Sequence, residues 1–157
     1  MKINHRLPAQ SLVEVIVAIG VSVILAVSLV TAVLITQKAS RSALNNTQAA
    51  KLAQQNIEQT RIFRDRNGFA AFPVDDTCYT LDNTFDSDPT NWSFVTSLCP
   101  VGEKIPLYNM VFIRKIAIDT DNDNPNKKLI TVTVSWNESG VNRTVTNDTF
   151  LTKWESP

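Results

Sequence analysis

Residues 10–37 read QSLVEVIVAIGVSVILAVSLVTAVLITQ, and Glu14 is the only charged residue among them. A hydrophobic segment of about 20 residues is long enough to cross a bilayer as a helix. A carboxylate inside such a segment is costly to bury, and it is usually retained because it has a function. The stretch therefore predicts a membrane-spanning helix and marks Glu14 as its candidate functional residue.

The residues before this segment form a short basic leader, MKINHRLPA, which carries Lys2 and Arg6 and ends in the small residue Ala9. A secretory signal has an apolar stretch of about 7–15 residues followed by a small-residue cleavage site. Here the apolar stretch is longer, and the polar sequence ITQKAS follows it. A plain signal anchor is the alternative, with its N-terminus in the cytoplasm, but it gives no reason for Glu14.

Leader and helix together resemble the class III leader of type IV pilins and pseudopilins. In that family a short basic leader ends in a small residue, and a segment such as FTLIE and an apolar helix follow. The matching residues here are Ala9, then QSLVE at 10–14, then VIVAIGVSVILAV. The family usually has glycine in place of Ala9 and phenylalanine in place of Gln10. The resemblance implies that prepilin peptidase cuts between Ala9 and Gln10 and methylates the new amine of Gln10.

In a filament core the carboxylate of Glu14 would be costly alone but tolerable when paired. Its natural partner is the amine of Gln10, in the same or a neighbouring subunit, and such an attraction would set the axial register between subunits. The resemblance implies a minor pilin or pseudopilin that starts as a single-pass protein of the cytoplasmic (inner) membrane, with its C-terminus outside. It implies prepilin peptidase and other pilin or pseudopilin subunits as partners.

Other classes of function remain open. The chain could be a pseudopilin of type II secretion or competence, a surface adhesin or DNA-binding pilin-like protein, or an ordinary anchored protein. Fifteen basic residues balance fifteen acidic ones, so net charge gives no indication of nucleic acid as a partner, outside a role in DNA uptake. Catalysis is not expected, because the only histidine, His5, lies in the leader and no Walker or GxGxxG motif is present.

The amphipathic sequence that follows the apolar segment predicts that the helix continues. No proline or glycine occurs between Ile35 and Gly68, and good helix formers dominate. Asn67-Gly68 is the expected stop. Small and apolar residues recur at helical spacing and predict a narrow buried stripe; they are Ala39, Ala43, Ala50, Ala53 and Ile57.

Residues 67–106 are rich in aspartate and proline, which predicts a loop region. If this region lies outside the cytoplasm, its two cysteines, Cys78 and Cys99, favour a disulfide, and two free thiols are the alternative. Four aromatic residues either seal this loop against the helix or form a binding surface; they are Tyr79, Phe85, Trp92 and Phe94.

The last third of the chain alternates with period two, as β-strands do. Two strands are predicted around 109–119 and 129–136, then a turn at 137–140 and a third strand from Val141. Short polar links predict an antiparallel meander. This stretch is similar to the end of minor pilins and small pseudopilins. The expected fold is α+β, with a long N-terminal helix packed on a three-stranded sheet. The expected segments are 1–9, 10–37, 38–66, 67–106 and 107–157.

The link between the first two strands contains Asp119, Asp121 and Asp123, a spacing that wraps carboxylates around calcium in other proteins. An EF-hand loop would need glycine where Asn124 stands and glutamate where Ile130 stands. The three aspartates thus predict either a calcium site or a solvated hairpin loop. No other cofactor is expected.

Overall fold

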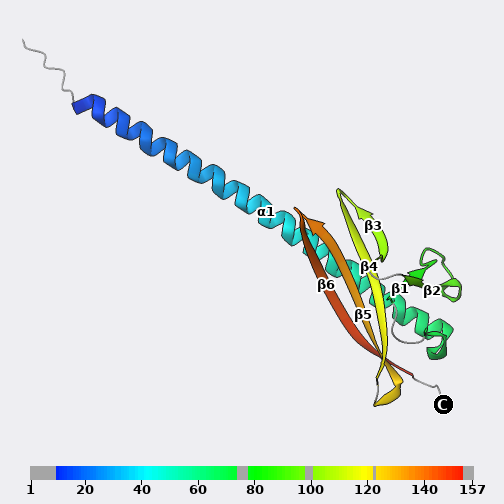
Figure 1. The fold of residues 1–157 in the computed structure, drawn as a ribbon. Coiled ribbons are helices and arrows are strands. Elements are labelled where there is room, and N and C mark those ends of the chain that lie inside the picture. The colour runs from blue at the N-terminus through cyan, green and yellow to red at the C-terminus, as the bar shows by residue number, and fades with distance from the viewer. Residues whose placement is uncertain (1–9, 74–77, 98–100, 122, 154–157) are drawn as a thin grey trace, which may run out of the picture. The chain divides into compact units, whose positions relative to one another are not determined.

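The computed structural model describes residues 10–73, 78–97, 101–121 and 123–153. The chain divides into two units between Ala43 and Leu44. In the first unit the described residues are all helical, and the second contains the rest of the helix and an antiparallel sheet (Figure 1). The predicted α+β fold, a long N-terminal helix packed on an antiparallel sheet, is confirmed.

Helix α1 covers Gln10–Asn67, 58 residues. It ends where the sequence predicts, because Gly68 adopts φ 83°, a left-handed conformation that glycine reaches without steric cost. The N–H of Gly68 donates to the carbonyl of Arg64 at 2.9 Å and satisfies one of the last carbonyls of the helix. Arg64 and Arg66 place positive charge in the last turn, where the helix dipole favours it.

The sheet has six strands, not the three predicted. They are β1 (Cys78–Asp82), β2 (Ser93–Ser97), β3 (Glu103–Leu107), β4 (Met110–Asp121), β5 (Asn124–Glu138) and β6 (Val141–Thr152). Strands β4 to β6 form the predicted meander. Strands β1 and β2, and β3 apart from Leu107, lie in residues 67–106, which we expected to be loop, so that prediction was wrong. Each has only five residues, too few for a clear period-two signal among the prolines and aspartates.

The short strands form because β4 offers a long edge for pairing. Strand β1 pairs with β4 through Cys78↔Ala117 and Tyr79↔Ile116. Strand β3 pairs with the beginning of β4, from Glu103↔Arg114 to Leu107↔Met110. The strand order is β2-β1-β4-β5-β6, and β3 shares the β4 edge with β1. The long-range pairing, which no local pattern encodes, thus converts part of the expected loop into sheet.

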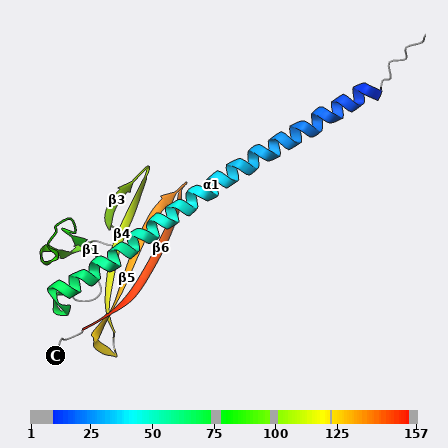
Figure 2. The same cartoon turned by 180° about the vertical axis from the view of Figure 1, so that it is seen from behind.

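The core lies between one face of this sheet and the part of α1 after Leu44 (Figure 2). The predicted period of two is confirmed in β4 and β5, since the alternate residues from Phe112 to Ile118 and from Ile130 to Trp136 are buried. The predicted helical stripe is correct in part. Ala53 and Ile57 are buried, Ala50 is half-buried, and Ala39 and Ala43 are exposed.

Ala49, which we did not place on the stripe, is fully buried. Its spacing of four to Ala53 and eight to Ile57 follows one helix face. Ala49 and Ala50 are chemically equal, so composition alone did not distinguish them. The buried face also includes the polar residues Asn56 and Thr60, where the Thr60 hydroxyl donates to the Asn56 carbonyl at 2.8 Å.

Aromatic rings seal residues 67–106 against the end of α1. The ring of Phe63 lies 4.8 Å from that of Phe94 and 5.6 Å from that of Phe72, and Tyr79 packs on Phe94 at 6.1 Å. These edge-on contacts are typical of buried aromatic pairs. Phe85 is fully exposed instead. Tyr79 and Phe94 therefore have the predicted sealing role, and Phe85 does not.

Candidate functional site

The largest unburied apolar surface of the described residues is the first half of α1. Sixteen large apolar side chains between Leu12 and Ile35 are each 48–70% exposed. Monomeric soluble proteins rarely expose a continuous apolar patch of this extent, because covering apolar surface is strongly favourable in water. By length and composition α1 can cross a membrane, and none of its most apolar window is buried within the chain. Burying this surface would require lipid or other protein chains.

The hydroxyl groups in this surface are satisfied by the helix itself. Each donates to the carbonyl four residues earlier at 2.8–2.9 Å; the pairs are Ser22 to Ala18, Ser28 to Ile24, Thr31 to Val27 and Thr36 to Ala32. An environment without water penalises an unmade hydrogen bond. These serines and threonines therefore fit an apolar surrounding on every side of the helix.

Glu14 is different. Its side chain is exposed, and no residue that the structure describes forms a hydrogen bond or an ion pair with it. Gln10 begins α1, one helical turn earlier, so the backbone nitrogen of Gln10 and the side chain of Glu14 belong to the same helix face. Ala9 lies outside the described residues. The predicted cleavage at Ala9–Gln10 and the methylation of Gln10 stay predictions.

Of the two cysteines in the predicted disulfide, only Cys78 is among the described residues. Cys78 begins β1 and is disulfide-bonded. Cys99 lies outside the described residues, so its pairing with Cys78 stays a prediction.

The aspartates of the predicted calcium loop lie mostly within strands. Strand β4 extends to Asp121 and β5 begins at Asn124, so the link is shorter than expected. Asp119 pairs with Leu129 inside the sheet. The carboxylate of Asp121 accepts from the N–H of Asp123 at 3.1 Å and forms an ion pair with Lys127 at 3.1 Å.

Two groups hold the pKa of Asp121 below its ordinary value of 3.8, first the backbone N–H of Asp123 and then the side chain of Lys127. Within residues 10–73, 78–97, 101–121 and 123–153, no three acidic, cysteine or histidine side chains are grouped as a metal site would require. The calcium site stays a prediction, and no further step rests on it.

An ion pair in the sheet was not predicted. Arg114 is 4% exposed and donates to the carboxylate of Glu103 through Nε at 2.9 Å and Nη2 at 2.7 Å. Its Nη1 contacts the carbonyl of Leu52 in α1 at 3.5 Å. The signal was visible in the sequence, since Arg114 is the one charged residue on the otherwise apolar face of the first predicted strand. Both of these donors reach the same oxygen, Oε2 of Glu103, and together with the bond to Leu52 they let the buried charge hold β3 and α1 to β4.

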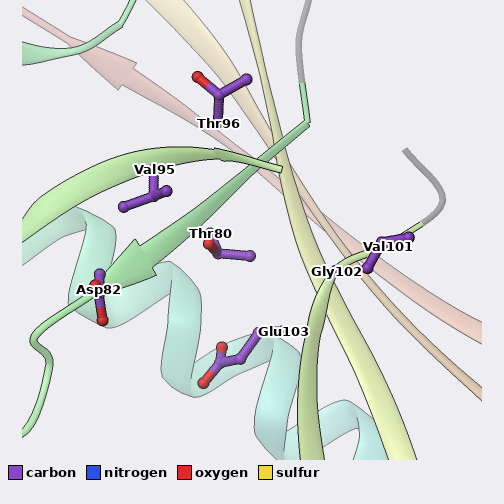
Figure 3. A pocket seen from close by; sticks show the side chains of 7 residues that line it. All are labelled: Thr80, Asp82, Val95, Thr96, Val101, Gly102 and Glu103. Carbon is purple, nitrogen blue, oxygen red and sulfur yellow. The ribbon is translucent and has the colours of Figure 1, made fainter. Parts of the chain in front are cut away.

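An open groove of about 440 Å³ lies between the β1–β2 hairpin and the start of β3 (Figure 3). Its lining residues are Thr80, Asp82, Val95, Thr96, Val101, Gly102 and Glu103. A Cβ at Gly102 would lie 2.3 Å from the carbonyl oxygen of Arg114, so only glycine allows β3 to begin here. The groove marks where β1 and β3 separate along β4, and the charged residues in its lining are Asp82 and Glu103.

Three comparisons were made with known proteins. No family model, no curated protein and no solved structure matches this chain. The candidate functional site is therefore defined by its own residues: the apolar surface of α1 and the single carboxylate of Glu14.

Proposed function

We propose that this chain is a type IV pilin-like subunit, a minor pilin or pseudopilin, whose work is assembly into a filament. The observation that carries the proposal is the fully exposed apolar half of α1 with one carboxylate at its start. A simple membrane anchor needs the apolar surface but not Glu14. A subunit that transfers the same helix from lipid into a protein core needs both.

The proposed mechanism follows from the solvation of that helix. In the membrane, lipid covers the apolar side chains, and Glu14 sits near the end of the segment, where it can reach the interface. In a filament, neighbouring helices replace the lipid. The carboxylate then requires a cationic partner. The free amine that cleavage would create at Gln10 lies one helical turn before Glu14 in the same subunit, and neighbouring subunits carry the same amine. Such an attraction in a low-dielectric core is strong enough to select one axial register.

The proposal places the N-terminus in the cytoplasm and the residues after α1's apolar half outside it. Prepilin peptidase, other pilin or pseudopilin subunits and the cytoplasmic membrane are the partners. It includes no catalytic role, in keeping with the absence of histidine after His5 in the sequence. The identity of the partner subunits would decide between a pilus, a secretion system and a competence system.

The mass of the mature N-terminus tests this function. The full chain is expressed with and without an active prepilin peptidase, purified from membranes, and analysed by intact mass spectrometry. We expect loss of residues 1–9 and one added methyl group only when the peptidase is present. An Ala9→Leu variant, whose larger side chain should block the cut, serves as the control. Intact Met1 in functional protein from cells with active peptidase would leave a simple anchor as the better account.

A further inference from the structure

We propose that the two hairpin turns at one end of the sheet form a lipid-contacting surface, with Tyr108 as its anchor. This inference rests on the proposed membrane attachment of α1, and it goes beyond the proposed assembly function. It concerns the unit Leu44–Pro157, in which no sequence motif indicates a lipid-contacting surface.

The first observation is a strained aromatic residue in full solvent. Tyr108 lies in the two-residue link between β3 and β4, has φ 53°, and is 87% exposed. Positive φ is unfavourable for a residue with a Cβ, and turns of this type favour glycine, asparagine or aspartate. The turn geometry thus gives no reason for tyrosine. A strained, exposed aromatic side chain points to a contact outside the domain.

The second observation is the position of this turn. Phe112 pairs directly with Trp136, so the β3–β4 turn and the β5–β6 turn lie at the same end of the sheet (Figure 1). At that end the side-chain amide of Asn45 donates to the carboxylate of Glu138 at 3.0 Å. The turns are therefore next to the first residues of α1 in this unit.

The third observation is the length of chain between this end and the apolar segment. Eight residues, 36–43, separate Ile35, the last large apolar residue of the segment, from Leu44. Even fully extended they span at most about 30 Å. The opposite end of the domain, where the side-chain amide of Asn67 donates to the carbonyl of Pro89, lies a further ~33 Å along the helical residues 45–67. The length of the chain therefore sets a smaller maximum distance from the apolar segment for the end with Tyr108 than for the opposite end.

The exposed side chains around Tyr108 suit the headgroup layer. Val111, on the same hairpin, is 51% exposed, and Val141, which begins β6 at the same end of the sheet, is 53% exposed. Tyrosine is enriched at membrane–water interfaces because its ring is apolar and its hydroxyl can remain hydrated. A lipid surface is the occupant we assign to this patch, because the proposed membrane attachment of α1 keeps lipid within the ~30 Å that the connecting residues can span.

The chain offers a matched control for a test. Phe85 is also an exposed aromatic residue in a link between strands, but it lies in the β1–β2 loop near Pro89, at the opposite end of the domain. A polarity-sensitive fluorophore is attached to Asn109→Cys, beside Tyr108, or to Ser87→Cys, beside Phe85. Labelling is selective among the described residues, which contain no free cysteine. The full chain is placed in nanodiscs whose lipids carry nitroxide headgroups, and in amphipol without lipid.

We expect the fluorophore at position 109 to be quenched several-fold more strongly than the one at position 87, and to shift to the blue only in nanodiscs. Adding Tyr108→Ser should reduce the blue shift at position 109, whereas Phe85→Ser should leave position 87 unchanged. Equal quenching at both positions, or a shift at position 109 that Tyr108→Ser leaves intact, would overturn this inference alone. Failure of the chain to enter nanodiscs would overturn the membrane attachment itself, a separate readout.

Discussion

Glu14 is the one charged side chain in the apolar segment 10–37, and the proposed function depends on it. It stands among Leu12, Val13, Val15 and Ile16, each more than half exposed, on a helix whose hydroxyl groups are already satisfied. In a helix that only anchors the chain in a membrane, this carboxylate would cost free energy and serve no purpose. Its role in the proposed mechanism is therefore separable from membrane insertion.

We predict that Glu14→Val leaves membrane insertion intact or improves it, because an apolar residue replaces a charge in lipid. The same change should strongly reduce incorporation into filaments, because the cationic amine of Gln10 then lacks a partner. Carbonate extraction measures insertion, and immunodetection in sheared filament fractions measures incorporation. Glu14→Asp, which keeps the charge, should retain more incorporation than Glu14→Val. Equal incorporation of wild type and Glu14→Val would remove the role assigned to this carboxylate.

Tyr108 provides a second prediction at the level of the residue. Replacing it with asparagine should stabilise the domain in the absence of lipid by about 0.5–1 kcal/mol, because asparagine tolerates the left-handed conformation better. Thermal unfolding of the detergent-solubilised chain measures this change. Tyr108→Ala, which keeps the strain and removes the ring, is the control and should not stabilise. A destabilising Tyr108→Asn would mean that the ring contributes to folding, and the argument from strain would fail.

At the scale of the element, the turn between β4 and β5 shows how local contacts hold one of the three aspartates of the link. The sequence places three aspartates close together, and mutual repulsion among them is expected without a counter-charge. The structure separates them, with Asp119 inside the ladder and Asp121 held by Lys127. Lys127 also lies 3.8 Å from the ring centroid of Phe150 on β6. One lysine thus links three strands at this end of the sheet.

This arrangement predicts a pH dependence with a defined sign. The pKa of Asp121 is lowered in the folded protein, so the ionised form is favoured by folding. Its contribution to stability is present above the ordinary aspartate pKa of 3.8 and is lost as pH falls through the lower folded value. NMR titration of the Asp121 carboxyl carbon should show the lowered pKa, and Lys127→Met should raise it partway. An ordinary pKa in the wild type would contradict the described hydrogen bonds.

Comparing the predicted with the observed elements shows which of them the sequence pattern alone could predict. The period-two alternation correctly predicted strands β4 and β5, and glycine correctly marked the end of α1. Strand β3 could not be predicted in this way. It contains Pro106, which a sheet accepts only at an edge or a similar position, and it forms because Arg114 and Gly102 allow it to dock on β4.

At the scale of the whole molecule, the hydrophobic core and the exposed apolar surface of α1 belong to different units of the chain. Every residue of the hydrophobic core, from Ala49 to Leu151, lies in the unit Leu44–Pro157. The apolar surface of Leu12–Ile35 contributes nothing to that core. A domain with its own core can fold without the segment to which we assign the membrane and filament contacts.

We therefore predict that a fragment of residues 44–157 is soluble and unfolds cooperatively. The closed disulfide at Cys78 should add to its stability, by about 2–4 kcal/mol on typical values. Size-exclusion chromatography and denaturant unfolding, with and without reductant, measure both properties. The same fragment carrying Val134→Asp serves as a control, because it places an unpaired charge in the core and should not fold. Aggregation of the unmodified fragment would show that the domain depends on the apolar helix.

The sequence by itself determined the features that depend on neighbours along the chain. These are the apolar segment with its single carboxylate, the length and end of α1, and the alternating strands of the meander. Only the tertiary structure decided which of two adjacent alanines is buried, that three further strands complete the sheet, and that Glu103 neutralises Arg114. The physical reason is the range of the interactions. Helix and strand periods are set by backbone geometry within a few residues, whereas pairing along β4 joins residues that only the folded chain brings together.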